Sequence, residues 1–260
     1  MNKHLIAACC AAAAALAAAP AQSEEKALRM ACESTYAPFV FFESGSGELK
    51  GFEIDLLNYI AKETGRKLEV TNMGFDAIIP SLLTGMHDLG ASAFTITEER
   101  AKRVNFTKPY YISGLSILVR AEDKGKIKSV KDIENTTVCA QIGTSGSMRA
   151  AKIPGAKVRN FNTINDAFLE LGNKGCTAVV TDRPVTAYFL AARPETAKTF
   201  YHLPETLNTE KFGFTLNKKN KQLLKEVDAA MDKARANGEF TKMYVKWFGE
   251  EPPKELLEVK

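Results

Sequence analysis

Cysteine and histidine are scarce in this sequence of 260 residues, which contains five cysteines and three histidines. No Cys-x-x-Cys pair is present, and five cysteines are too few to staple a small domain that lacks a core. The chain also has no His-Glu-x-x-His motif and no EF-hand loop, and the glycine-rich segment 143–147 lacks the lysine of a phosphate-binding loop. These absences argue against a zinc site, a calcium loop and nucleotide-phosphate chemistry.

A strong excess of one charge is absent as well. Lysine and arginine number 35 against 31 acidic residues, which gives a net charge of +4. Acidic residues are interspersed nearly everywhere, so no basic stripe indicates a nucleic-acid partner. With 45% apolar and 25% charged residues, the composition is that of a folded chain and excludes disorder. The length allows one large domain or two modest ones.

One long apolar stretch occupies residues 5–21, but it is mostly alanine and contains Pro20, so a spanning helix is not expected. Lys3 precedes it, and Ala19-Pro20-Ala21 fits a small-x-small cleavage site. We therefore predict a signal peptide over residues 1–21. The alternative is a lipoprotein box at Ile6–Cys9, which would leave an apolar region of about five residues, shorter than usual.

Cleavage after Ala21 leaves three cysteines, namely Cys32, Cys139 and Cys176. An odd number in an exported chain means at least one free thiol or an intermolecular bond. Cys139 and Cys176 fall within β-like runs, so we expect them to be buried and unpaired rather than catalytic.

Short β-like runs alternate with helical runs from residue 27 onward, which predicts an α/β fold with a mostly parallel, helix-covered sheet. The expected strands of the first part are 28–32, 51–55, 67–72 and 88–93. The expected helices are 56–64, 76–83 and one that Thr97 opens, with Glu98 and Glu99 in its first turn.

The pattern restarts after Gly114 with an expected strand at 115–120 and a strand-helix series from 138 to about 203. After Pro204, an expected strand at 212–216 precedes two amphipathic helices that Gly238 separates. We therefore predict one lobe from residues 22–114 and 205–260 and a second lobe from residues 115–204. Two crossovers between lobes predict a hinge around a central cleft.

Polar residues follow several of the expected strands, where open α/β sheets bind ligands. They form the turn Ser92-Ala93-Phe94-Thr95 with Arg100 after it, the turn Gly143-Thr144-Ser145-Gly146, and Asp182. An arginine fork pairs with a carboxylate, main-chain N–H groups at a helix start favour an anion, and Asp182 can accept from an ammonium group. Together they indicate a zwitterion site, although Arg100 alone fits a surface ion pair and Asp182 alone a helix cap.

Several ordered motifs carry a family resemblance over essentially the whole mature chain. They are Tyr36–Phe39, Gly51–Leu56, Phe75–Leu82, Thr95–Arg100, Pro109–Tyr111 and Gly238–Gly249. In these the sequence resembles the polar amino acid-binding proteins of bacterial ABC importers, which include glutamine-, histidine- and lysine/arginine/ornithine-binding proteins. The resemblance implies a type II periplasmic binding protein fold, a periplasmic monomer without a cofactor, and a permease as membrane partner.

The resemblance also implies roles for matching residues. Arg100 would clamp the α-carboxylate with Thr95 and Thr144, and Asp182 would hold the α-ammonium with the carbonyl of Ala93. Tyr36 and Phe75 would sandwich the aliphatic part of the ligand, and Glu33 would receive its side-chain nitrogen donors. The expected ligand-binding set is Glu33, Tyr36, Phe75, Ala93, Phe94, Thr95, Arg100, Gln141, Thr144, Ser145 and Asp182.

Four positions depart from family patterns. Ala93 and Gly146 replace polar residues of the lysine/arginine type, and Gln141 and Thr181 replace a lysine and a histidine of the glutamine type. Glutamine, arginine, histidine and lysine-like ligands all stay open, whereas Glu33 disfavours an acidic ligand. The alternative function is an enzyme on the same scaffold that resembles cyclohexadienyl dehydratases, with Glu33 or Asp182 as proton donor.

Overall fold

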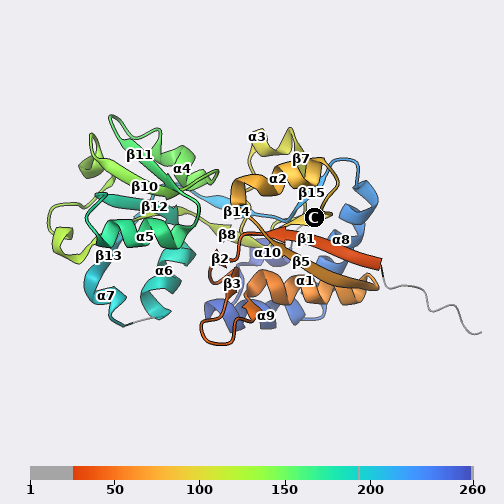
Figure 1. Cartoon of the computed structure of the whole chain (residues 1–260). Helices are drawn as coiled ribbons and strands as arrows, with labels where there is room; N and C mark the ends of the chain where they lie inside the picture. The colour runs from red at the N-terminus through yellow and green to blue at the C-terminus, as the bar shows by residue number, and fades with distance from the viewer. Residues whose placement is uncertain (1–25, 193, 259–260) are drawn as a thin grey trace, which may run out of the picture.

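The computed structural model of the protein describes residues 26–192 and 194–258. The predicted signal peptide and the alternative lipid site at Cys9 lie outside these residues. Two lobes, each built on a five-stranded sheet with helices packed against it, lie side by side (Figure 1). The predicted two-lobed α/β fold is confirmed.

The first sheet has the strand order β5-β1-β6-β15-β7. Its strands are β1 (Lys26–Cys32), β5 (Arg66–Asn72), β6 (Leu89–Gly90), β7 (Val104–Phe106) and β15 (Thr215–Asn217). β1 runs parallel to β5 and β6, whereas β15 is antiparallel to β6 and β7. The chain therefore returns to the first sheet after it has built the second.

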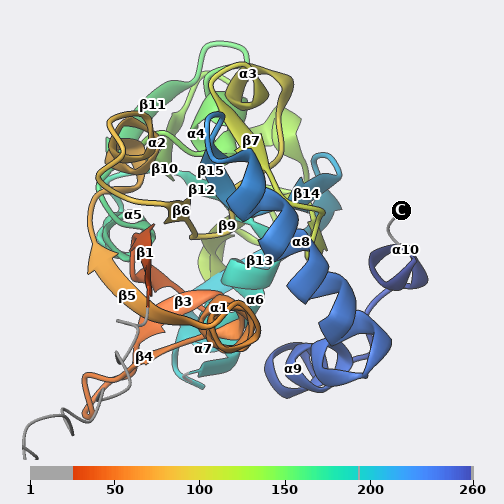
Figure 2. The same cartoon turned by 90° about the vertical axis from the view of Figure 1, so that its right-hand side faces the viewer.

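Helices cover both faces of this sheet. They are α1 (Phe52–Glu63), α2 (Phe75–Leu83), α3 (Glu98–Ala101), α8 (Lys221–Ala236), α9 (Glu239–Phe248) and α10 (Lys254–Leu257). Leu28 and Met30 on β1 pack into the cluster of α1, whereas Ala31 packs with α2. This is the two-residue alternation of a strand between two layers. α8 runs along the outer end of the lobe (Figure 2).

The second sheet has the order β11-β10-β12-β9-β13. Its strands are β9 (Leu115–Arg120), β10 (Thr137–Gln141), β11 (Lys157–Phe161), β12 (Ala178–Asp182) and β13 (Phe200–Thr206). The helices of this lobe are α4 (Ser145–Ala150), α5 (Ile164–Gly172), α6 (Arg183–Ala192) and α7 (Thr196–Thr199). Two 3-10 turns, η1 (Ala121–Asp123) and η2 (Val130–Ile133), follow β9. β10 is parallel to β11 and β12, and β9 is antiparallel to its neighbours. The carboxyl ends of β10 and β12 therefore share one edge.

Two chain crossings join the lobes. β8 (Tyr111–Ser113) leads through Gly114 into β9, and β13 leads back to β14 (Glu210–Phe212). β8 and β14 pair antiparallel, so both crossings belong to one two-stranded ribbon between the lobes (Figure 1). A small sheet of β2 (Thr35–Tyr36), β3 (Val40–Phe42) and β4 (Leu49–Lys50) lies beside the lobe contact.

Three sequence-based elements are wrong in detail. The strand expected at 88–93 is limited to β6, because the chain turns at Ser92 and Ala93, which have positive φ. Residues 51–55 are not a strand, because α1 begins at Phe52, after Gly51 with φ of 137°, where a Cβ would lie 2.0 Å from the Phe39 carbonyl oxygen. The single strand expected at 212–216 is two strands, β14 and β15. They divide at Gly213 and Phe214 because β14 pairs with the ribbon and β15 with the first sheet.

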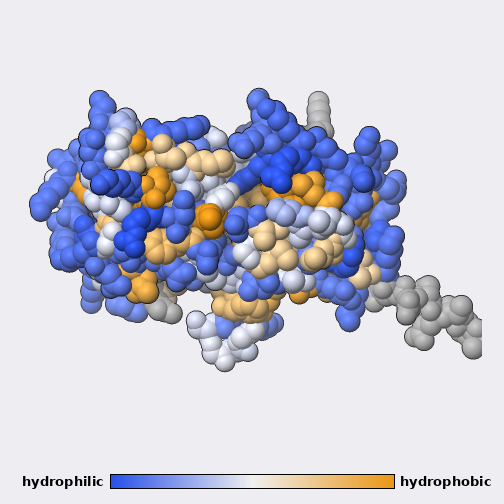
Figure 3. Space-filling view, turned by 45° about the horizontal axis from the view of Figure 1, so that its top comes forward, coloured by the Kyte–Doolittle hydropathy of each residue, from blue (hydrophilic) through white to orange (hydrophobic). Residues whose placement is uncertain are grey.

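The apolar core of the first lobe gathers aromatic rings around Phe52. This side chain is fully buried, and its ring lies 5.2 to 6.0 Å from those of Tyr110, Phe240, Tyr244 and Phe248. The surface in Figure 3 is largely hydrophilic, with apolar residues in separate patches. In the described residues, Cys32, Cys139 and Cys176 are buried and free of disulfides, and no helix has the length and apolarity to cross a bilayer.

We predict that Phe52→Ala lowers the free energy of unfolding by about 3 to 5 kcal/mol, because it leaves a cavity among these rings. Phe42→Ala is the control, since Phe42 is 50% exposed and should change stability little. Urea denaturation of both variants measures the difference. Equal losses would show that the ring cluster is not the dominant core of this lobe.

Candidate functional site

A strained turn after β6 carries the first part of the predicted site. Ser92 and Ala93 have φ of 101° and 51°, which non-glycine residues adopt rarely. The carboxylate of Glu53, on the first turn of α1, accepts from the main-chain N–H groups of Ser92 at 2.8 Å and Ala93 at 2.9 Å, and it also accepts from the Tyr110 hydroxyl. Glu53 thereby fixes the turn that leads to Thr95.

Arg100 follows this turn on the short helix α3. Thr97 caps the helix, accepting from the Arg100 main-chain N–H at 3.2 Å. The guanidinium lies 5.5 Å from the Phe75 ring centroid and 5.3 Å from that of Phe94, and these two rings stack at 4.4 Å. Arg100 is thus held against an aromatic wall that both predicted phenylalanines form.

The Arg100 guanidinium contacts both lobes. It donates to the Thr95 carbonyl oxygen at 2.9 Å and to the Gly143 carbonyl oxygen of the second lobe at 2.9 Å. The side chain is only 7% exposed, yet it forms no ion pair with any carboxylate in the described part of the chain. A buried cation that lacks a charged partner is costly, so this group is suited to an incoming anion.

The second lobe presents Thr144, Ser145 and Asp182 at the shared edge of β10 and β12. Thr144 caps α4 by accepting from the Ser147 N–H at 3.1 Å, and it donates to the Gln141 carbonyl at 2.7 Å. Asp182 is 3% exposed and accepts from the Tyr36 hydroxyl of the first lobe. The predicted residues of the two lobes therefore meet.

Glu33 and Gln141 form another contact across the lobes. Gln141 Nε2 donates to Glu33 Oε2 at 3.0 Å and to the Asn162 carbonyl oxygen at 3.0 Å, and the Thr35 hydroxyl also donates to Glu33 Oε2 at 3.0 Å. Gln141 Oε1 is buried and has no hydrogen-bond partner among the described residues. This pair of acceptors, one carboxylate and one amide oxygen, suits a ligand group that carries N–H donors.

Burial shifts the ionisation of the site. It raises the pKa of Asp182 to about 7, with the nearby Glu210 as the second cause, and it raises the pKa of Glu33 above its usual range. Burial lowers the pKa of Arg100, which the charges of Glu210 and Asp182 oppose. The site is therefore a dehydrated one in which an ionised group gains strongly from a charged partner.

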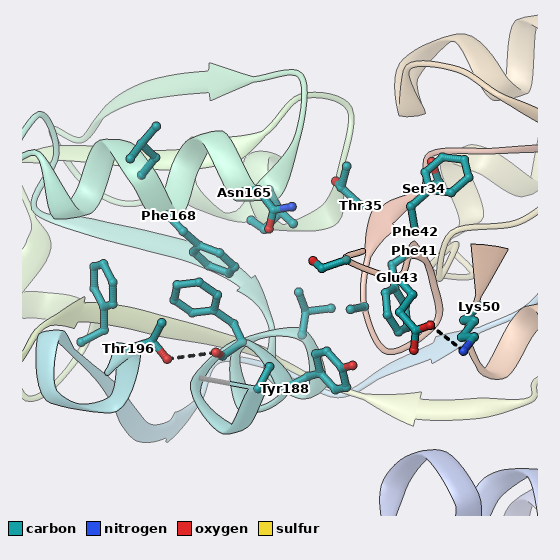
Figure 4. A pocket seen from close by; sticks show the side chains of 18 of the residues that line it. Ser34, Thr35, Phe41, Phe42, Glu43, Lys50, Asn165, Phe168, Tyr188 and Thr196 are labelled. Atoms are coloured by element: carbon teal, nitrogen blue, oxygen red, sulfur yellow. Dashed lines mark hydrogen bonds and ion pairs between the residues drawn. The ribbon is translucent and has the colours of Figure 1, made fainter. Parts of the chain in front are cut away.

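A cavity of about 910 Å³ opens beside Glu33 and Tyr36 between the lobes. The β2–β3 hairpin lines one side with Thr35, Phe41 and Glu43, and α5 and α6 line the other with Phe168 and Tyr188 (Figure 4). Arg100 and Asp182 are not among its lining residues; Arg100 donates to the Gly143 carbonyl and Asp182 accepts from the Tyr36 hydroxyl across the lobes. The cavity adjoins the part of the site expected to receive the ligand side chain.

The structure thus brings most of the predicted site residues into contact across the lobes, with Ala93, Phe94 and Thr144 directly beside them in sequence, and all except Ser145 are buried. Two acids escaped the sequence reasoning, Glu53 and Glu210, which are 0% and 7% exposed. Glu53 lies inside the Gly51–Leu56 motif on a helix with an apolar face, a weak signal of a buried acid. Within the described residues, no three metal-ligating side chains cluster.

Comparisons with known proteins agree with this geometry. Residues 28–250 match the bacterial extracellular solute-binding proteins, family 3. A "probable histidine-binding protein" of Neisseria gonorrhoeae is 31% identical over 237 residues, which cover 89% of this chain and 87% of that protein.

Two solved structures are also similar. One is the arginine-, lysine-, histidine-binding protein of Geobacillus stearothermophilus, with TM-score 0.83, 31% identity and coverage of 90% and 100%. The other is an ancestral amino acid-binding protein described as a precursor of cyclohexadienyl dehydratase, with TM-score 0.78, 36% identity and coverage of 85% and 95%. The fold and the lobe contact define a two-lobed solute-binding protein. The chain belongs to solute-binding protein family 3.

We predict that Asp182 makes stability depend on pH in a defined direction. Its pKa of about 7 in the folded protein exceeds that of an unfolded aspartate, so the folded state retains a proton that the unfolded state has lost. The free energy of unfolding should therefore fall as pH rises from about 4 to about 7. Asp182→Asn should remove this part of the dependence.

Urea denaturation of both proteins between pH 4 and 8, without added amino acids, measures the effect. Because other buried acids titrate in both proteins, the informative quantity is the difference between parent and variant. Parallel curves across this range would contradict the assignment.

Proposed function

We propose that this protein captures a polar amino acid between its lobes and presents it to the permease of an ABC importer. The observation that supports this most directly is Arg100, which is buried without an ion pair in the described chain, across the site from the carboxylate of Asp182. A guanidinium and a carboxylate held apart in a dehydrated site match the two charges of an amino acid.

In this proposal Arg100 takes the α-carboxylate together with main-chain N–H groups of the turns at Thr95 and Thr144. The hydroxyls of these threonines donate to Glu210 Oε2 and to the Gln141 carbonyl, so the arginine carries the larger part of the interaction. Asp182 and the Ala93 carbonyl take the α-ammonium, which would displace the Tyr36 hydroxyl from Asp182.

Glu33 and Gln141 would select the ligand side chain. Both offer acceptor oxygens, and Glu33 is acidic, so amide, guanidinium, imidazole and amine groups fit and a carboxylate does not. The relatives named for histidine and arginine support this range. Tyr36 and Phe75 would flank the aliphatic part, which requires the Phe75 ring to serve the ligand while it stacks on Phe94.

The proposal includes export to the periplasm with loss of residues 1–21, action as a monomer without a cofactor, and lobes formed by residues 22–114 with 205–260 and by 115–204. Closure of the lobes around the ribbon of β8 and β14 would bury the ligand and create the form that a permease recognises.

The second candidate function is a periplasmic enzyme on this scaffold. Two observations favour it: the similarity to a dehydratase precursor, and the pKa of about 7 of Asp182, which suits a proton donor. Against it, Arg100, which forms no ion pair among the described residues, and Asp182 across the site fit a zwitterion that is bound and released. We therefore propose binding without chemistry.

We predict that a small set of polar amino acids raises the melting temperature of the purified protein. A thermal-shift panel of the twenty amino acids with ornithine and cystine provides the measurement, because a ligand at 100 times its Kd stabilises by about 2.7 kcal/mol. Glutamine, arginine, histidine and lysine should include the positive ligands, and aspartate and glutamate should be negative.

No shift with any amino acid would contradict the proposed function. Prephenate is the control for the enzyme candidate, and loss of its ultraviolet absorbance on mixing would favour that candidate instead.

We predict that Arg100→Ala raises the Kd of the best ligand at least about 100-fold, equivalent to about 2.7 kcal/mol. Arg103→Ala is the matched control, because Arg103 is three residues away and exposed. Isothermal calorimetry on both variants measures the Kd and distinguishes the loss of a direct contact at Arg100 from the loss of one positive charge nearby. Near-normal binding by Arg100→Ala would overturn the carboxylate assignment.

A further inference from the structure

Glu210 is an acid on the ribbon between the lobes that the proposed ligand contacts do not use. It is the first residue of β14, is 7% exposed, and pairs with Ser113 of β8. Its Oε2 accepts from the Thr95 hydroxyl at 2.7 Å and from the Ser145 hydroxyl at 2.9 Å. These hydroxyls lie 3.1 Å apart.

The two donors belong to different lobes. Thr95 is on the turn held by Glu53 in the first lobe, and Ser145 is the first residue of α4 in the second. One carboxylate oxygen therefore links both halves of the site. Since opening the cleft must separate Thr95 from Ser145, it must break at least one of these charge-assisted hydrogen bonds.

The other oxygen of Glu210 is tied to the chain crossings. Oε1 accepts from Asn208 Nδ2 at 2.8 Å, and Asn208 Oδ1 accepts from the Leu115 main-chain N–H at 2.9 Å. Leu115 is the first residue of β9, directly after the first crossing, and Asn208 lies on the second. A continuous set of hydrogen bonds thus runs from both crossings to both lobes.

We propose that Glu210 is a positioning residue that couples the hinge to the ligand site and stabilises the closed arrangement of the lobes. Its carboxylate holds Thr95 and Ser145 together from β14, one of the two strands of the ribbon between the lobes. The effect on ligand affinity rests on the proposed function, whereas the effect on lobe closure does not. A ligand held by Arg100 and Asp182 would then dissociate slowly because closure is reinforced.

The test measures lobe separation by fluorescence energy transfer. Lys67→Cys on β5 and Lys152→Cys after α4 place dyes on exposed positions of the two lobes in the chain without residues 1–21. Its three native cysteines, Cys32, Cys139 and Cys176, are buried and should escape labelling. The variants are Glu210→Ala, Ser145→Ala and the double substitution. Glu205→Gln is the control, because this nearby acid lies outside the ribbon, at the end of β13, and its carboxylate accepts from the Val130 main-chain N–H.

Without any added amino acid, we expect Glu210→Ala to reduce the ratio of closed to open molecules at least about threefold, and Ser145→Ala to reduce it less. The double variant should match Glu210→Ala rather than add the two effects, as expected for groups in one network. With a bound amino acid, dissociation from Glu210→Ala should be about tenfold faster and association little changed. Glu205→Gln should behave as the parent does.

Equal energy transfer in Glu210→Ala and Glu205→Gln would overturn the proposal, and so would strictly additive effects in the double variant. A fall in melting temperature without a change in lobe separation would assign Glu210 a merely structural role. If Glu210→Ala fails to fold, Ser145→Ala decides: unchanged lobe separation would contradict the bridge. A parent protein that binds no amino acid would refute the proposed function and leave the closure measurement intact.

Discussion

The hydrogen bonds that Glu53 accepts from the turn at Ser92 and Ala93 are the interaction on which the proposed ligand site depends. A fully buried carboxylate is costly unless its acceptors are satisfied, and here two main-chain N–H groups and the Tyr110 hydroxyl satisfy them. In return the carboxylate holds two residues at positive φ. That conformation sends the chain through Thr95 into α3, which sets the position of the Arg100 guanidinium.

The second constraint is that both chain crossings lie in one ribbon. Because β8 and β14 are paired, the lobes can change their separation with little change inside either sheet. The groups that meet across the cleft come from both lobes and from the ribbon itself. A ligand can shift such an equilibrium only through contacts that are stronger in one arrangement, and the proposed ligand contacts of Arg100 and Asp182 at the lobe interface would be of this kind.

The sequence predicted the regular elements well and the buried acids poorly. Strand 115–120 matches β9 to the residue, and the helix after residue 221 and the cap at Thr97 follow from apolar spacing and a local side chain. These signals are local. Glu53 and the turn whose N–H groups donate to it are about forty residues apart, and Glu210 lies 115 residues from Thr95, so no spacing reveals these contacts. The strand expected at 212–216 failed for the same reason, because its two halves choose partners in different sheets.

Closure of the lobes carries two electrostatic costs at the same site, one for burying a cation and one for burying an anion. In the proposed mechanism, closure buries Arg100 with no carboxylate partner among the described residues, which would disfavour closure until an anion arrives. Burial also raises the pKa of Asp182, so in the same mechanism an ionised Asp182 would disfavour closure until a cation arrives. An amino acid relieves both costs at once, whereas a simple anion or a simple amine relieves one. In the proposed function, selectivity for a zwitterion therefore follows from the pairing that burial demands, and Glu33 and Gln141 would set the side-chain preference.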